Sequence, residues 1–136
     1  MSDQQKTILV AEDERPMARA LEMKLTHEGF RVMAVFDGEA ALAVLLEQKI
    51  DLLILDLVMP KMDGFSVLRH IKEKGIALPV VVLSNLSQIE DEKKAKELGA
   101  REFCIKSDTP IAEIVKKVKQ ILPALSQKCV SRNRSV

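Results

Sequence analysis

Acidic side chains follow two short apolar runs of the sequence, at the point where each run ends. Asp56 comes directly after residues 52–55, and Glu12 and Asp13 come directly after residues 7–11. Apolar runs of this length are typical of strands buried on both faces of a sheet. If the two strands are parallel neighbours, their ends lie roughly 5 Å apart, and the three carboxylates would share one pocket.

Three carboxylates so close together repel one another strongly unless a cation lies between them. Oxygen ligands with room for water suit Mg²⁺, which prefers an octahedral shell and retains several waters. Lys106 follows another short run, residues 102–105, and would bring a further positive charge to the same edge of the sheet. Such a balanced site suits phosphoryl transfer, in which a carboxylate can itself be the nucleophile.

A hydroxyl completes the set, because Ser84 follows the apolar run of residues 79–83. Each of these residues alone has an ordinary explanation. An acid or a lysine at a strand end is usually solvated, and a serine there commonly caps a helix. Their joint occurrence at the same end of four strands favours a functional site.

The segments between the strands have the apolar spacing of amphipathic helices. Strands are expected over about residues 7–11, 31–36, 52–55, 79–83 and 102–105, and helices over about residues 16–28, 40–45, 65–74, 87–98 and 110–122. This alternation predicts an α/β fold, with a parallel sheet and helices on both faces. In such sheets, ligands bind beyond the carboxyl ends of the strands, at the switch in strand order.

The fourth helix has an unusual composition. With Ser87 as its expected cap, it offers only Ile89, Ala95 and Leu98 as apolar contacts, and charged residues fill most of the remaining positions. We expect this helix to be thinly anchored and mobile, because few side chains hold it to the core.

The last helix, in contrast, has the clearest apolar face of the sequence. Asp108 or Thr109 is expected to cap it, with Pro110 at its first position. The helical pattern fades beyond residue 123. We therefore predict one domain over residues 1–123, followed at residues 124–136 by a flexible basic tail or the start of a linker.

The composition excludes several other classes of protein. A chain of 136 residues with 47% hydrophobic and 30% charged residues suits one globular domain with a soluble surface. The net charge of +1, and an aromatic content of 3% without Trp or Tyr, argue against direct nucleic-acid binding. No apolar run approaches the roughly 20 residues that span a bilayer. With no signal peptide at the start, we expect a cytoplasmic protein without membrane contact, in which Cys104 is a buried free thiol.

These residues together resemble the receiver domain of two-component response regulators, of the chemotaxis-receiver kind. The resemblance extends from about Lys6 to Leu122. It rests on the following matches: the acid pair Glu12-Asp13, the pattern Asp-x-x-Met-Pro-x-Met-x-Gly over residues 56–64, Ser84, Phe103 and Lys106. It implies a doubly wound, flavodoxin-like sheet of five parallel strands in the order 2-1-3-4-5.

The resemblance also implies a role for each matched residue. Asp56 is then the phosphoacceptor, and Lys106 pairs first with Asp56 and later with its phosphoryl group. The Mg²⁺ ligands implied are Asp13, Asp56 and the backbone carbonyl of Val58, with Glu12 acting nearby through water. Ser84 occupies the position of the switch hydroxyl, and Phe103 that of the switch aromatic residue.

The implied function is a phosphorylation-dependent switch that assists only its own phosphorylation and dephosphorylation and is not otherwise an enzyme. A sensor histidine kinase or a phosphotransfer protein would supply the phosphoryl group. The surface of the fourth helix, fifth strand and fifth helix would then change, and a downstream protein or a fused output domain would read the change. The domain would be a monomer or a phosphorylation-dependent homodimer.

Four features depart from the usual pattern of the family. Ser107 stands where a proline usually follows the lysine, often after a cis peptide, so we expect either a trans peptide there or a strained cis bond. Asn85 replaces a small residue. Val58 and Leu86 are apolar where some receivers position the hydrolytic water, which predicts a long-lived phosphoryl group. Phe103 cannot donate a hydrogen bond as tyrosine would.

Two other functions compete with the switch. Phosphohydrolases that form an aspartyl phosphate usually have a second acid two residues after the nucleophile, but here that residue is Val58. We also expect no extra domain that could hold a substrate. A degenerate receiver that serves only as a binding scaffold is the other alternative. The presence of all the acids and of Lys106 argues against it.

Overall fold

A sheet of five parallel strands organises the molecule. The computed structural model describes residues 5–86 and 88–122. The strands follow the order β2-β1-β3-β4-β5, with these bounds: β1 (Thr7–Ala11), β2 (Arg31–Val35), β3 (Leu52–Leu55), β4 (Val80–Ser84) and β5 (Glu102–Ile105). The predicted fold class and strand order are therefore confirmed.

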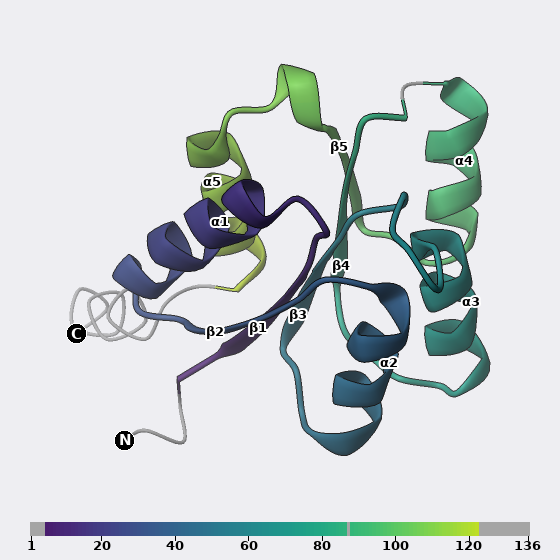
Figure 1. Ribbon diagram of the computed structural model, residues 1–136, viewed down its shortest axis with the longest axis horizontal. Coiled ribbons are helices and arrows are strands. Elements are labelled where there is room, and N and C mark those ends of the chain that lie inside the picture. The colour runs from purple at the N-terminus through teal and green to yellow at the C-terminus, as the bar shows by residue number, and fades with distance from the viewer. Residues whose placement is uncertain (1–4, 87, 123–136) are drawn as a thin grey trace, which may run out of the picture.

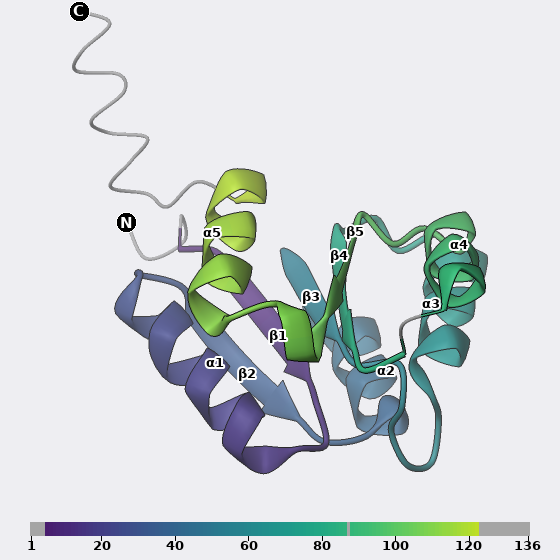
Figure 2. The ribbon, with the colours of Figure 1, turned by 90° about the horizontal axis from the view of Figure 1, so that it is seen from above.

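Helices cover both faces of the sheet. Their bounds are α1 (Arg15–His27), α2 (Gly38–Glu47), α3 (Gly64–Glu73), α4 (Ile89–Glu97) and α5 (Ile111–Ile121), and a short 3₁₀ helix, η2 (Lys106–Asp108), follows β5. α1 and α5 lie on one face of the sheet, and α2, α3 and α4 lie on the other (Figure 1). The view from above shows the same two layers of helices with the sheet between them (Figure 2).

The central strand β3 is buried along its whole length. Leu53 and Leu55 pack in the core beneath α2, α3 and α4, while Leu52 and Ile54 pack in the core beneath α1 and α5. Alternate side chains of a strand point to opposite faces, so a strand covered on both faces needs apolar residues at every position. This requirement explains the apolar run before Asp56.

The direction of chain winding changes next to β1, which lies between β2 and β3. Ala11 is paired with Leu55, and the amide of Asp56 donates a hydrogen bond to the carbonyl of Ala11 over 2.9 Å. The ends of β1 and β3 are therefore neighbours at the point where ligands bind in sheets of this kind.

Helix α4 is held only weakly to the core. Ala95 is its one buried residue, and Ile89 is 81% exposed, so the expectation that Ile89 makes an apolar contact was wrong. Ile89 is the first residue of α4, and its side chain is exposed to solvent at that end of the helix. Two contacts with α3 add support: the Lys94 ammonium lies 4.4 Å from the centre of the Phe65 ring, and Lys72 donates to the carbonyl of Glu97 over 3.2 Å. The expected cap, Ser87, lies outside the described residues.

The predicted start of the last helix was wrong by one residue. Pro110 has ψ 155° and is the N-cap of α5, so the first helical residue is Ile111. No side chain of the described residues caps this end. The predicted apolar face is confirmed, since Ile114, Val115 and Val118 are buried.

Several other expectations concern single residues. The peptide bond between Lys106 and Ser107 is trans, as are all the peptide bonds in the described ranges. Cys104 is a buried free thiol, as expected. Cys129 and the predicted tail or linker of residues 124–136 lie outside the described part of the chain. Within residues 5–86 and 88–122, no helix combines the length and apolar character needed to cross a bilayer.

The burial of β3 predicts how strongly the fold depends on it. Leu53 is fully buried, whereas Leu46 on α2 is 55% exposed. We expect Leu53→Ala to lower the free energy of unfolding by about 2–5 kcal/mol, because it removes buried apolar surface and leaves a cavity. The control Leu46→Ala removes the same atoms at the surface and should cost less than about 1 kcal/mol. Urea denaturation of both variants measures the difference, and equal losses would contradict the assigned core.

Candidate functional site

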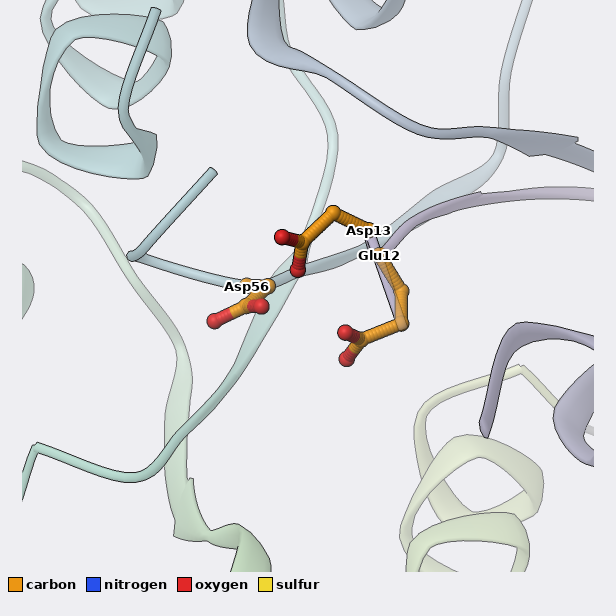
Figure 3. Close-up of side chains that lie close together, drawn as sticks. All are labelled: Glu12, Asp13 and Asp56. Carbon is orange, nitrogen blue, oxygen red and sulfur yellow. The ribbon is translucent and has the colours of Figure 1, made fainter. Parts of the chain in front are cut away.

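Three carboxylates meet at the carboxyl end of the sheet (Figure 3). Glu12 and Asp13 follow β1, Asp56 follows β3, and one oxygen atom of each lies within 4.8 Å of the others. Glu12 is 1% exposed and Asp56 is 3% exposed, whereas Asp13 is open to solvent. The strand pairing thus brings together the acids that the sequence predicted, with Asp13 on the solvent side.

Lys106 supplies the positive charge of the site. Its Nζ donates to Glu12 Oε2 over 2.9 Å and to Asp56 Oδ2 over 3.1 Å. Lys106 begins η2 after β5, and β4 separates β5 from β3. Its long side chain is therefore needed to cross the end of β4, and one ammonium group serves two buried carboxylates.

Two backbone amides hold the acids in place, but one oxygen atom has no partner. Asp56 Oδ1 accepts a hydrogen bond from the amide of Val58 over 3.1 Å, and Glu12 Oε2 accepts one from the amide of Glu14 over 2.9 Å. Glu12 Oε1 is buried without any hydrogen-bond partner in the part of the chain that the structure describes. A buried oxygen in this state is costly unless a ligand satisfies it.

Burial shifts the proton affinity of both buried acids. Desolvation raises the pKa of Glu12 from 4.5 to about 7, although the hydrogen bonds from Lys106 and from the Glu14 amide oppose it. Desolvation also raises the pKa of Asp56, against the hydrogen bonds from the Val58 amide and Lys106. Burial alone would lower the pKa of Lys106, but its hydrogen bonds to Glu12 and Asp56 outweigh burial and raise it. The site is therefore short of positive charge.

The residues present fit a divalent cation. Among the described residues, all the candidate ligands are oxygen atoms, Glu12 Oε1 has no donor, and three carboxylates surround one ammonium group. Hard oxygen ligands beside a solvent-open position suit Mg²⁺, which keeps several of its waters when bound. The acid cluster thus matches the cation site expected from the sequence.

The two expected switch residues lie on the neighbouring strands β4 and β5. Ser84 ends β4 and is fully buried, and its Oγ accepts a hydrogen bond from the amide of Leu86 over 3.1 Å. Phe103 is half-buried on β5 and packs against the core beneath α2, α3 and α4. It also borders a groove of about 410 Å³ between α4, β5 and α5. Ser84 is thus next to the site, and Phe103 connects β5 with the surface of α4.

Sequence analysis did not assign a role to Glu14. Its Oε1 lies 3.3 Å from Lys106 Nζ, while the side chain remains 56% exposed. The only indication in the sequence was that Glu14 follows the acid pair Glu12-Asp13 directly. The contact nevertheless depends on how the start of α1 packs beside η2, which local spacing does not reveal.

The comparison with family models identifies the class of protein. The sequence matches the response regulator receiver domain over residues 8–119. The chain belongs to the response regulator receiver domain family of two-component systems. The family resemblance noted in the sequence is therefore confirmed over most of the chain.

Two relatives show how far the similarity extends. The transcriptional regulatory protein DltR of Streptococcus agalactiae is 34% identical over 116 residues, which cover 83% of this chain and 52% of DltR. The response regulator ArlR of Staphylococcus aureus is 33% identical over 121 residues, which cover 89% of this chain and 54% of ArlR. The chain spans about half the length of the curated relatives it matches.

Solved receiver structures share the fold. The receiver domain of the Francisella response regulator 1452 has a TM-score of 0.81 at 27% identity, covering 86% of this chain and 96% of that domain. The response regulator TrrA of Thermotoga maritima was solved in complex with Mg²⁺ and BeF. It has a TM-score of 0.77 at 30% identity, and the match covers 87% of this chain and 100% of TrrA.

The raised pKa of Glu12 predicts how stability changes with pH when no divalent cation is present. The folded protein keeps a proton on Glu12 up to about pH 7, whereas the unfolded chain releases it near pH 4.5. The contribution of the Glu12 proton to the free energy of unfolding is therefore complete below pH 4.5 and is lost as the pH rises through about 7. The raised pKa of Asp56 acts in the same direction.

We expect Glu12→Gln to reduce the dependence of the free energy of unfolding on pH. At pH 8, in a chelating buffer, the variant should have a free energy of unfolding about 1–3 kcal/mol above that of the native chain, and the difference should shrink toward pH 5. Urea titrations at several pH values measure it. Glu47→Gln, which changes an exposed carboxylate on α2, is the control. If the free energy of unfolding of Glu12→Gln depended on pH as strongly as that of the native chain, burial would not raise the pKa of Glu12.

Proposed function

We propose that this chain is a phosphorylation-dependent signalling switch that accepts a phosphoryl group on Asp56. One observation carries the proposal: the buried Asp56 carboxylate lies in one cluster with Glu12, Asp13 and Lys106. Phosphoryl transfer depends mainly on positioning and on neutralising charge, and this pocket offers an oriented carboxylate, an ammonium group and a cation site.

The hydrogen bonds of Asp56 prepare it as a nucleophile. The Val58 amide and Lys106 each hold one of its oxygen atoms, so the carboxylate has a defined orientation. An Asp56 oxygen forms a bond to phosphorus as the bond from phosphorus to the donor nitrogen of a phosphohistidine breaks. The electron pair of that bond leaves with the imidazole. Lys106 remains beside the acquired phosphoryl oxygens and balances part of their charge.

The cation site serves the same step. Asp13, Asp56 and the carbonyl of Val58 would hold Mg²⁺ directly, and Glu12 would act on it through water. When bound, Mg²⁺ supplies positive charge that offsets the repulsion between the carboxylates and the incoming phosphoryl oxygens. The related receiver TrrA was solved in complex with Mg²⁺ and BeF, which supports a Mg²⁺ site in this chain as well.

The response begins at Ser84. Its Oγ accepts from the Leu86 amide, and its proton has no acceptor among the described residues, so the hydroxyl can donate to a phosphoryl oxygen. Moving Ser84 toward the phosphoryl group draws in the segment before α4, and Phe103 can then rotate inward. Because α4 has one buried residue, this movement changes the surface of α4, β5 and α5 at low cost.

The partners follow from the same chemistry. A histidine kinase or a phosphotransfer protein in the cytoplasm donates the phosphoryl group, and an output domain or a separate protein reads the altered surface. DltR carries the name of a transcriptional regulatory protein and is about twice as long as the matched region. That similarity supports control of transcription through a further domain as the output of this receiver.

Phosphorylation of Asp56 is tested by intact mass. After incubation with Mg²⁺ and acetyl phosphate, the native chain should gain the mass of one phosphoryl group, and Asp56→Asn should gain none, because an amide cannot act as the nucleophile. Asp51→Asn is the matched control. Asp51 lies just before β3, at the opposite end of the strand, and accepts from the Thr7 amide over 2.8 Å, so this variant should be phosphorylated like the native chain.

The same samples report on the switch. Hydrogen exchange of amides in α4 and β5 should change on phosphorylation and remain as before in treated Asp56→Asn. Failure to gain mass with a phosphohistidine donor as well as with acetyl phosphate would overturn the proposal in favour of a binding scaffold. A gain of mass without any change in α4 or β5 would overturn the assigned output surface.

The lifetime of the phosphoryl group depends on Val58 and Leu86. Val58 is 56% exposed next to Asp56, and neither side chain can orient an attacking water. We expect a half-life of minutes or longer, and Val58→Asn should shorten it about tenfold by positioning the water. Met23→Asn, which changes an exposed residue of α1, should leave the half-life unchanged. The decay of phosphorylated mass over time measures all three, and a native half-life of seconds would contradict the prediction.

A further inference from the structure

The amino end of α2 presses against the loop that follows β3. Gly38, the first residue of α2, is buried, and its backbone lies directly against Met62 in that loop. A Cβ atom added to Gly38 would collide with the carbonyl oxygen of Met62 and would lie 2.7 Å from its carbonyl carbon. Real side chains do not approach a backbone this closely, so only glycine leaves room for the loop in its present position.

A second contact joins the same two segments. Asp37 Oδ1 accepts from the Ala40 amide over 2.8 Å and so caps α2, while Asp37 Oδ2 lies 3.8 Å from Lys61 Nζ. Lys61 has φ 70°, a backbone conformation that residues other than glycine rarely adopt. The loop is therefore held in an uncommon conformation where it meets α2.

The loop is equally constrained on its other side. A Cβ atom added to Gly64 would lie 2.5 Å from the carbonyl oxygen of Asp56 and 2.7 Å from Leu57 Cα. The Gly64 amide donates to the carbonyl of Leu57 over 2.9 Å. The backbone of residues 58–63 thus closes a tight turn between α2 and the residues around the phosphoacceptor. We therefore expect a displacement at Met62 to be passed along this short loop toward Asp56.

We propose that Gly38 is a positioning residue for the cation and phosphoryl site, acting through the backbone of residues 58–63. The inference rests on the proposed function, in which the Val58 carbonyl is a ligand and the Val58 amide orients Asp56. Gly38 contacts neither of these groups. Its missing side chain sets how closely α2 and the loop approach, and this distance fixes where the Val58 backbone lies relative to Asp56 Oδ1.

The test compares two substitutions of glycine by alanine. Gly38→Ala introduces the collision with Met62. Gly75→Ala, after α3, introduces strain at φ 67° but has nothing within 4 Å of the added carbon. Both variants should lose stability, because alanine is disfavoured at each position for its own reason. Only Gly38→Ala should alter the site.

Two measurements separate the variants. In the cation-free protein, hydrogen exchange at the Gly64 amide should become about tenfold faster in Gly38→Ala, relative to amides of α1, and stay within about twofold of the native rate in Gly75→Ala. In a titration with Mg²⁺ followed by NMR, Gly38→Ala should bind about tenfold more weakly than Gly75→Ala. Equal exchange rates and equal Mg²⁺ affinities in the two variants would overturn the proposal.

The first measurement does not need the site to bind a cation. If the native chain fails to bind Mg²⁺, the proposed function loses its cation, yet the exchange comparison still decides whether Gly38 positions the loop. If Gly38→Ala does not fold, Asp37→Asn takes its place. Asparagine retains the cap of α2 and removes the charge that faces Lys61. Faster exchange at Gly64 in this variant supports the proposal, and unchanged exchange overturns it.

Discussion

Two buried carboxylates share a single ammonium group, and the rest of the structure depends on this arrangement. Lys106 donates to Glu12 and Asp56 across the end of the sheet, although Glu12 follows β1, Asp56 follows β3 and Lys106 begins η2. A buried charge without a partner is strongly destabilising, so the three segments must keep their relative positions. The hydrogen-bond ladders of the parallel strands provide this rigidity. Any group that alters the charge balance at this point acts on the whole end of the sheet.

The elements around that site differ in how firmly they are anchored to the core. β3 is buried along its length, and the loop after it is confined between Gly38 and the backbone of Asp56. α4, in contrast, buries only Ala95. Under the proposed function, this contrast directs the response, because a new charge at Asp56 cannot displace the core but can move the weakly held helix. The stability of the fold and the mobility of the switch thus reside in different elements.

The chain keeps the acids and the lysine that its family resemblance implies, while the positions around them differ. The acids and Lys106 form the contacts expected of a receiver, which the family match over residues 8–119 supports. The neighbouring positions differ: Val58 and Leu86 are apolar, and a trans peptide precedes Ser107. In a receiver, residues that contact the phosphoryl group determine whether phosphorylation occurs. Neighbouring residues, here Val58 and Leu86, would determine how long the phosphoryl group persists. Under the proposed function, variation at these neighbouring positions would leave the acceptor chemistry of Asp56 unchanged.

The sequence by itself determined the fold class, the strand order implied by its family and the acid, lysine and hydroxyl residues of the site. These features are encoded locally, because buried strands need unbroken apolar runs and functional groups follow where the runs end. Only the tertiary structure decided that Ile89 is exposed, that Glu14 reaches Lys106 and that Gly38 meets Met62. Each of these depends on how separate elements pack in space. Spacing along the chain reports which face of an element is buried, but not which residue of another element lies against it.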